Sequence, residues 1–216
     1  KKDTLKLNPD FSFNVLVDLS KEQIISNVFI DNQSKLFDKS YMPLKDSAFE
    51  FGSVFKPFTV YSALKNKKIT LDEYFNVDES VFIGKKLVND FPRSSQIPYQ
   101  VKDILKKSSN RGAVLIGRTL DCQKELKKDL GLFGLLQSTN IGFDLYSIDP
   151  IVNNFRGSYC DTIPYGYGLS VSPIQLINAY GIMITGREDF KATINKKNFQ
   201  KENIFNSNSI ILNKLL

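Results

Sequence analysis

The N-terminal part of the chain has the alternating hydrophobic pattern of a β-strand. Apolar side chains occupy every second position of residues 11–19, and only Leu16 breaks the alternation. A second segment, residues 24–30, is rich in β-branched side chains and follows a short polar stretch, which is typical of an antiparallel hairpin. Residues 31–50 are polar and irregular and contain Pro43, so we expect a loop there.

After Gly52 the apolar positions recur at helical spacing, as Val54, Phe58, Tyr61 and Leu64. Because proline is tolerated only in the first turn of a helix, Pro57 allows this helix to start no earlier than Gly52. The pattern therefore places Ser53 at the helix N-terminus.

The remaining sequence alternates between predicted helices and irregular stretches. The best-specified helix follows Ser172, where Pro173 and Gln175 complete a capping box, and it ends at Gly186. Other helices are predicted over residues 100–107, 112–120, 121–130 (ending at Gly131) and 204–216, with loop and short strand over 69–99 and mostly loop over 141–171. These elements predict an α+β fold in which helices pack on an antiparallel sheet.

The composition excludes several kinds of catalytic site. The chain has no histidine, so a Ser-His-Asp triad, a Cys-His protease and a His-ligated metal centre are all ruled out, and a serine nucleophile would need lysine as its base. Cys122 and Cys160 are too few for a disulfide scaffold or a thiolate zinc site. They could form one bridge, but we expect free buried thiols, the commoner fate.

The net charge of +6 does not indicate a nucleic-acid partner. The lysines are scattered as pairs such as Lys67-Lys68 and Lys106-Lys107, without a dense block or an arginine-rich stripe, so we interpret them as solvated surface. No apolar run approaches the ~18 residues of a membrane span, and Lys1-Lys2-Asp3 does not resemble a signal peptide.

Two serine–lysine pairs have the spacing that brings a hydroxyl and an amine to one helix face: Ser53 with Lys56, and Ser62 with Lys65. Ser53 lies at a helix N-terminus, where the dipole favours an oxyanion, although its position also suits a simple N-cap. Ser62 lies mid-helix and is expected at the surface. As a base, Lys56 would need a pKa lowered from ~10.4 to about 7, which requires burial or a nearby cation.

A second polar group would have to relay protons and hold an acyl substrate. Ser-x-Asn occurs three times, at Ser12, Ser108 and Ser138, but only Ser108-Ser109-Asn110 falls in a tight turn between two predicted helices.

Taken together, three segments resemble the transpeptidase domain of the class B penicillin-binding proteins in order and approximate spacing. They contain Gly52-Ser53-Val54-Phe55-Lys56, Ser108-Ser109-Asn110 and Tyr165-Gly166-Tyr167-Gly168. The Tyr-Gly-Tyr-Gly run and residues 123–136 are most similar to the septal (division) branch. The resemblance implies the penicillin-binding, β-lactamase-like fold, an α+β architecture.

The resemblance also implies a role for each residue of the site. Ser53 would be the acylated nucleophile, with its own backbone N–H as half of the oxyanion hole, and Lys56 would be its base. Ser108 would relay protons beside Lys56. Asn110 would bind the amide of the substrate or orient the lysine. No cofactor or metal is implied.

By the same resemblance, the reaction is D,D-transpeptidation of peptidoglycan stem peptides through a serine acyl-enzyme, and β-lactams acylate the same serine. The parent protein would be anchored upstream in the bacterial inner membrane, face the periplasm, and work with a septal glycan polymerase and other divisome proteins. Nucleic acid is not an expected partner.

Two departures from the family pattern are visible. Phe51 stands where the family usually has proline, and no Lys-Thr-Gly or Lys-Ser-Gly triplet occurs anywhere in the sequence. We therefore expect residues 1–216 to be a partial transpeptidase domain that stops before this third motif and is inactive alone.

Three other interpretations remain open. A class A β-lactamase would need a Glu-x-x-Leu-Asn segment between the second and third motifs, and the surroundings of Glu125 do not fit it. A non-catalytic division scaffold or β-lactam sensor would keep the fold without forming an acyl-enzyme. An unrelated α/β domain would carry these motifs by chance.

Overall fold

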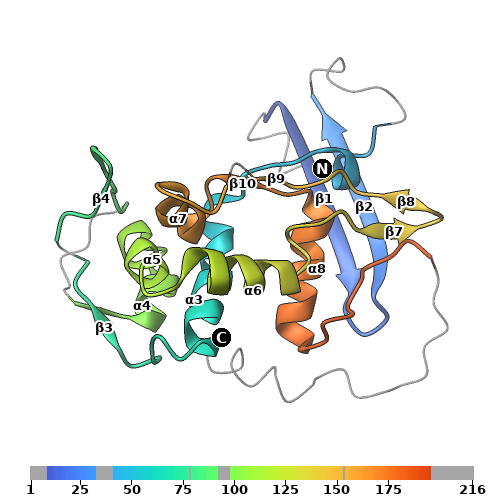
Figure 1. Ribbon diagram of the computed structural model, residues 1–216. Helices are drawn as coiled ribbons and strands as arrows, with labels where there is room; N and C mark the ends of the chain where they lie inside the picture. Colours follow the sequence, from blue (N-terminus) through green and yellow to red (C-terminus); the bar gives the residue numbers. More distant parts are fainter. Residues whose placement is uncertain (1–8, 33–40, 78, 92–97, 153, 196–216) are drawn as a thin grey trace.

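The computed structural model describes residues 9–32, 41–77, 79–91, 98–152 and 154–195 (Figure 1). The helix predicted over residues 204–216 lies outside these ranges. Figure 1 shows a β-hairpin on one side of the molecule, several helices on the other, and one long helix, α8 (Pro173–Thr185), between them.

The hairpin has the register that the alternation predicts. Strand β1 (Phe11–Asp18) pairs antiparallel with β2 (Gln23–Asp31), and a bulge interrupts the register between Leu16 and Val17. Leu16, the residue that breaks the hydrophobic alternation, is 58% exposed. The carboxylate of Asp18 accepts the backbone N–H groups of Ser20 and Lys21 at 2.9 and 3.1 Å, which holds the turn between the strands.

The other strands are two or three residues long and form two-stranded pairs; short strands were expected within 69–99, but those within 140–170 lie in a segment predicted to be mostly loop. The pairs are β3 (Tyr74–Phe75) with β6 (Tyr99–Gln100), β4 (Phe82–Ile83) with β5 (Lys86–Leu87), β7 (Asn140–Gly142) with β8 (Leu145–Tyr146), and β9 (Ile151–Val152) with β10 (Leu169–Ser170).

One helix was missed in the segment that the sequence assigns to a loop. Helix α2 (Pro43–Asp46) is a single turn with Pro43 at its first position, where the fixed φ of proline is already helical. The Asp46 carboxylate accepts the backbone N–H of Met42 at 2.8 Å. Pro43 therefore begins a helix rather than interrupting a loop.

The longer predicted helices are present, with small differences at their ends. They are the 3₁₀ turn η1 (Gly52–Phe55) leading into α3 (Lys56–Lys65), α4 (Val101–Lys106), α5 (Asn110–Gly117), and the π-helical turn η2 (Cys122–Leu126) leading into α6 (Lys127–Leu132). A further short helix, α7 (Tyr159–Thr162), continues into the 3₁₀ turn η3 (Ile163–Tyr165); both were missed, because the sequence assigns 141–171 mostly to loop.

The helix predicted over residues 121–130 was expected to end at Gly131, but α6 continues through Gly131 to Leu132. Gly134 is the residue with positive φ, at 72°. Its N–H bonds to the carbonyl of Gly131 at 2.9 Å, and the N–H of Leu135 bonds to that of Leu130 at 3.1 Å. This pair of bonds is the Schellman motif, so the helix ends two residues later than predicted, and Gly134, not Gly131, is the glycine that follows it.

Helix α8 matches its sequence signals in full. Ser172 and Gln175 form the reciprocal capping box, Pro173 occupies the first helical turn, and Gly186 ends the helix with a φ of 71°. None of the helices within the described ranges combines the length and hydrophobicity that crossing a bilayer requires.

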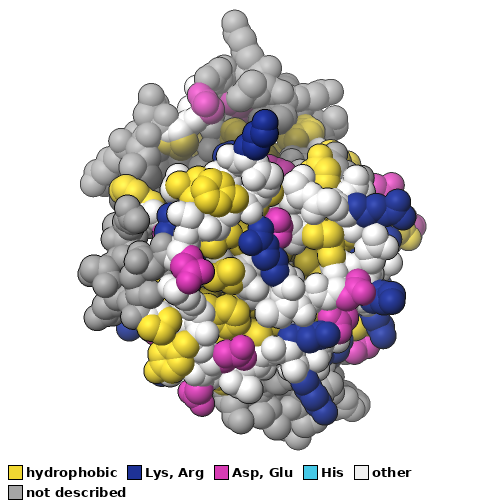
Figure 2. Space-filling model, turned by 60° about the vertical axis from the view of Figure 1, so that its left-hand side comes forward, with side chains coloured by type: hydrophobic (Ala, Val, Ile, Leu, Met, Phe, Trp, Pro, Cys, Tyr) yellow, Lys and Arg dark blue, Asp and Glu magenta, His cyan; other side chains and the backbone are white. Residues whose placement is uncertain are grey.

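An aromatic cluster joins three helical segments in the core. The ring of Phe58 on α3 lies edge-on to Phe133, which follows α6, at 5.1 Å, and to Tyr180 on α8 at 5.0 Å. Phe58 is fully buried. This packing fixes the direction of α3, the helix that begins at Lys56. On the face seen in Figure 2, basic, acidic and apolar side chains are interspersed.

The expectation of free thiols is wrong, because Cys122 and Cys160 form a disulfide. Their Cα atoms lie 5.6 Å apart, although the residues are 38 positions apart in sequence. Both side chains are half-buried rather than buried. The bond ties η2 to α7, two segments whose proximity depends on the tertiary fold and so could not be inferred from local sequence.

We expect a Cys122→Ser, Cys160→Ser double variant to lose roughly 2–4 kcal/mol of unfolding free energy, since the bond constrains the unfolded chain. Denaturant titration measures this difference. Dithiothreitol should lower the stability of the wild type to that of the variant and leave the variant unchanged. Equal stability of oxidised wild type and variant would contradict the prediction.

Candidate active site

The amine of Lys56 is the centre of a buried polar cluster. Lys56 is only 1% exposed, and its Nζ lies 2.9 Å from Ser53 Oγ, one helical turn earlier. Nζ also lies 3.0 Å from Ser108 Oγ, 2.6 Å from the Ser108 carbonyl oxygen and 2.8 Å from Asn110 Oδ1. The structure thus brings together all four predicted site residues: Ser53, Lys56, Ser108 and Asn110.

Burial changes the acidity of this amine. Desolvation lowers the pKa of Lys56 from its usual 10.5 to about 8, although the negative charge of Asp90 acts in the opposite direction. The neutral amine is therefore accessible near physiological pH. Ser53 itself is exposed, so the site presents a reachable hydroxyl above a buried amine.

The Tyr-Gly-Tyr-Gly segment packs directly on the backbone that carries Ser53. Gly52 N–H donates to the carbonyl of Gly166 at 3.2 Å, and Phe49 exchanges two backbone hydrogen bonds with Val171. Gly166 has a φ of 96°, and a Cβ on it would lie 1.9 Å from the Gly52 carbonyl oxygen. Only glycine permits this close approach, so the segment contributes to the site by positioning the backbone next to Ser53.

Ser108 occupies a strained backbone position. Its φ is 54°, a conformation that usually favours glycine. It directly follows the C-cap of α4, and the N–H groups of Ser108 and Ser109 bond to the carbonyls of Leu105 and Ile104 at 3.0 and 2.9 Å. This is again the Schellman motif. The site keeps a hydroxyl where a glycine would cost less, and such strain commonly accompanies a functional role.

Asn110 connects the amine to a neighbouring backbone segment. Its Oδ1 accepts from Lys56 Nζ, and its Nδ2 donates to the carbonyl oxygen of Asn89 at 2.9 Å. Both ends of the amide are therefore engaged, and the side chain is oriented toward the lysine.

Asp90 is a site residue that the sequence did not reveal. Its carboxylate accepts from Ser109 Oγ at 2.6 Å and from the backbone N–H groups of Asn110 and Arg111 at 2.6 and 3.0 Å. It lies in a segment assigned only to loops and short strands, and it follows no motif. The one available signal is that Ser109-Asn110 begins a helix, where a carboxylate is favourable.

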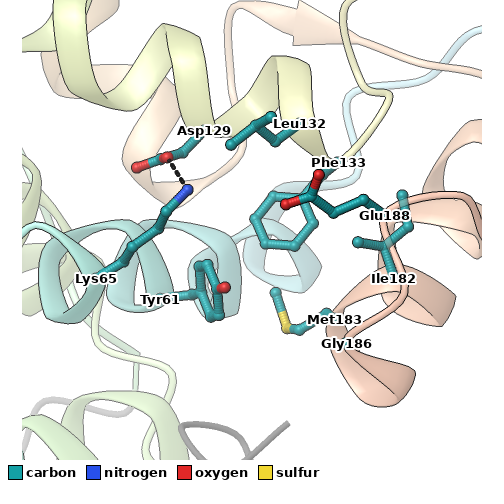
Figure 3. Close-up of a pocket in the computed structure, with 9 residues that line it drawn as sticks. All are labelled: Tyr61, Lys65, Asp129, Leu132, Phe133, Ile182, Met183, Gly186 and Glu188. Carbon is teal, nitrogen blue, oxygen red and sulfur yellow. Dashed lines mark hydrogen bonds and ion pairs between the residues drawn. The ribbon is translucent and has the colours of Figure 1, made fainter. Parts of the chain in front are cut away.

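The second serine–lysine pair serves a structural network instead. Ser62 is fully buried, so the expectation that it lies at the surface is wrong. Its hydroxyl donates to Asp129 at 2.6 Å, and Lys65 Nζ forms an ion pair with the same carboxylate at 2.8 Å. Figure 3 shows Lys65 pointing to Asp129 at the edge of a small pocket that Phe133 and Glu188 also line. Local sequence could not predict that Ser62 is buried, because its hydrogen-bond partner lies in α6, 67 residues away.

Within the described residues, no group of three or more cysteine and acidic side chains is placed to hold a metal ion. The chemistry available to the cluster is that of a hydroxyl nucleophile beside an amine base, with the Ser108 hydroxyl 3.0 Å from the same amine.

Known proteins resemble this chain in sequence and in fold. The family described as the penicillin binding protein transpeptidase domain matches residues 13–212. The peptidoglycan D,D-transpeptidase FtsI of Buchnera aphidicola subsp. Baizongia pistaciae is 30% identical over 183 residues, which cover 79% of this chain and 31% of that protein. Penicillin-binding protein PbpB of Mycolicibacterium smegmatis is 31% identical over 140 residues, covering 64% and 22%.

Among solved structures, the transpeptidase domain of penicillin-binding protein 3 from Burkholderia pseudomallei superposes with a TM-score of 0.79 at 24% identity, covering 100% of this chain and 64% of that one. The fold is therefore the penicillin-binding, β-lactamase-like α+β fold. Within that class, the chain belongs to the penicillin-binding protein transpeptidase domain family. It spans 22% and 31% of the lengths of the two curated relatives.

We expect Ser108→Gly to relieve backbone strain of about 1 kcal/mol while removing the hydroxyl from the amine. The matched control is Lys67→Gly, because Lys67 has a φ of 55° in the same type of motif after α3 and is exposed. Neither variant should lower the melting temperature, but only Ser108→Gly should slow acylation by a fluorescent penicillin. Equal acylation rates in the two variants would contradict a role for the Ser108 hydroxyl.

Proposed function

We propose that this chain carries the nucleophile, the base and the proton relay of a D,D-transpeptidase that cross-links peptidoglycan stem peptides through a serine acyl-enzyme. The observation that carries the proposal is the buried Lys56 amine, within 3.0 Å of both Ser53 Oγ and Ser108 Oγ. A lysine in contact with two hydroxyls can take a proton from one and pass it through the other.

The acceptors around the amine favour this direction of proton transfer. A neutral lysine has two N–H groups and one lone pair. The Ser108 carbonyl oxygen and Asn110 Oδ1 can only accept hydrogen bonds, so they take both N–H groups. The lone pair is then left to face the hydroxyls of Ser53 at 2.9 Å and Ser108 at 3.0 Å, and both serines are exposed.

The proposed reaction has two balanced halves. Ser53 Oγ attacks the carbonyl carbon between the two terminal D-alanines, and Lys56 takes the hydroxyl proton. The C–N bond breaks, the leaving D-alanine amine takes a proton through Ser108, and a Ser53 ester remains. An amine of a neighbouring stem then attacks the ester, giving its proton to the site and restoring the Ser53 hydroxyl.

The backbone N–H of Ser53, in the 3₁₀ turn before α3, would stabilise the tetrahedral oxyanion as one donor of the oxyanion hole. Asn110 would orient Lys56. β-Lactams would acylate Ser53 because their strained amide presents the same carbonyl chemistry to the nucleophile.

We place residues 1–216 within one transpeptidase domain. The resemblance of the Tyr-Gly-Tyr-Gly segment to the septal branch, together with the relatives named FtsI, supports a role in septal wall synthesis. Such a role entails a periplasmic site on the inner membrane, peptidoglycan as substrate, and a glycan polymerase and divisome proteins as partners.

Covalent labelling tests the nucleophile and base. The protein tested is the one encoded by the whole reading frame that contains residues 1–216. A fluorescent penicillin should label its wild type, whereas the rate of labelling should fall by at least about 10³-fold in Ser53→Ala and in Lys56→Met. Lys65→Met is the matched control, since it removes the lysine of the other Ser-x-x-Lys pair. It should keep the wild-type rate.

The same proteins can be tested for D-alanine release from a stem pentapeptide in the presence of an acceptor amine. Labelling of Ser53→Ala at the wild-type rate would overturn the assignment of the nucleophile. A folded wild type that never forms the adduct would instead make the chain a non-catalytic member of the family.

The pH dependence of acylation tests the protonation state of the base. Because burial lowers the pKa of Lys56 to about 8, the second-order rate of labelling should rise with pH and level off above about 8. Below this pKa the protonated amine cannot accept the serine proton. Hydrolysis of the probe in buffer is subtracted at each pH. An inflection near the ordinary lysine pKa of ~10.4 would contradict the prediction.

A further inference from the structure

We propose that Asp90 is a positioning residue for acyl transfer: it locks the Ser108-Ser109-Asn110 turn against Lys56 and supplies the negative charge of the site. This inference rests on the proposed function, because it names a residue that acts through the lysine and the relay serine rather than on the substrate.

The first argument is the number of bonds that converge on one carboxylate. Asp90 Oδ2 accepts from the Ser109 hydroxyl at 2.6 Å, and Oδ1 accepts from the N–H groups of Asn110 and Arg111 at 2.6 and 3.0 Å. These bonds reach two consecutive backbone N–H groups and the N-cap side chain of α5. Together they fix where Asn110 leaves the turn, and thus where its Oδ1 meets Lys56 Nζ.

The second argument is that the turn needs an external restraint. Ser108 holds a positive φ of 54° without being glycine, and this conformation costs roughly 1–3 kcal/mol. Ser109, at 1% exposed, accepts from Gly112 N–H at 2.9 Å and so must point its hydroxyl proton elsewhere. Asp90 receives that proton. The carboxylate therefore completes a turn whose own sequence does not favour its shape.

The third argument is the anchoring of the segment that carries Asp90. The guanidinium of Arg111, which is 6% exposed, donates to the carbonyls of Val88 at 2.9 Å and Val77 at 3.2 Å. Asn110 Nδ2 holds the Asn89 carbonyl. Val88 and Asn89, the two residues that precede Asp90, are thus tied to the start of α5, and these contacts hold the carboxylate in place.

The charge of Asp90 faces the amine without forming an ion pair with it. The four atoms within 3.0 Å of Lys56 Nζ are two hydroxyl and two carbonyl oxygens, all uncharged. Asp90 is the charged group that raises the Lys56 pKa against desolvation. The other nearby cations have partners of their own: Lys107 Nζ lies over the Tyr99 ring at 4.1 Å, and Arg111 binds the two valine carbonyls.

Three variants separate position from charge. Asp90→Asn keeps an oxygen that can accept the two N–H groups but removes the charge. Asp90→Ala removes both. Asp72→Asn is the control, since Asp72 is an exposed carboxylate in a turn. Each variant is made in the product of the reading frame, its folding is checked by circular dichroism and thermal melting, and labelling by a fluorescent penicillin is followed across pH below the melting temperature.

We expect Asp90→Ala to slow labelling by about 10-fold to 100-fold, because small misplacement of reacting groups costs rate on this scale. Asp90→Asn should retain labelling with its inflection at lower pH than the wild type, since the charge that favours the protonated amine is gone. Asp72→Asn should match the wild type in both rate and inflection.

Two results would overturn the inference: a folded Asp90→Ala protein labelled at the wild-type rate, or an Asp90→Asn profile that superimposes on that of the wild type. A purely structural role would lower the melting temperature without moving the inflection. Failure of the wild type itself to be labelled would count against the proposed function, and it is distinguishable because it does not depend on Asp90.

Discussion

The site depends on the removal of one lysine amine from water. Lys56 is 1% exposed, and burying a charged ammonium is costly unless polar groups replace the lost hydration. Four oxygens within 3.0 Å do so, and none of them is charged. Neutral acceptors can bind the N–H groups of both the charged and the neutral amine. A carboxylate in contact would instead favour the charged form. Desolvation by burial lowers the pKa of Lys56 to about 8, and the negative charge of Asp90 opposes this shift only in part.

Surrounding one amine from several sides requires unusual backbone. Ser53 comes from the same helix as Lys56, but Ser108 and Asn110 come from a turn more than fifty positions later in the chain. Ser108 contacts the amine with both its hydroxyl and its carbonyl oxygen from a left-handed backbone conformation, directly before the N-cap of α5. On the other side, Gly166 lies against the Gly52 carbonyl and fixes the turn that carries Ser53. The strain is concentrated where the reacting atoms must meet.

The parts that the sequence predicts well are those encoded by neighbours along the chain. The β1–β2 hairpin follows from residue alternation, α8 from Ser172, Pro173 and Gln175, and the Ser53–Lys56 contact from helical spacing. Contacts between distant segments could not be derived in this way. Asp90, the disulfide and the burial of Ser62 each depend on a partner 19 to 67 residues away. The resemblance to a known family brought Ser108 and Asn110 into the site, but it gave no information about the carboxylate behind them.

The two serine–lysine pairs of α3 show why spacing alone does not define the chemistry. Both pairs lie along the continuous η1–α3 segment at the same separation, and both serines and both lysines find polar partners. Ser62 and Lys65 share a carboxylate, Asp129, that accepts from both, so the hydroxyl and the amine are directed to a third group and away from each other. Near Lys56, the carboxylate of Asp90 does not contact the amine. It binds the Ser109 hydroxyl and the backbone N–H of Asn110 instead. At Lys65 the carboxylate contacts the amine directly, whereas at Lys56 the nearest carboxylate does not. Lys56 can therefore hydrogen-bond Ser53, and this difference distinguishes a structural ion pair from an arrangement that we propose serves acyl transfer.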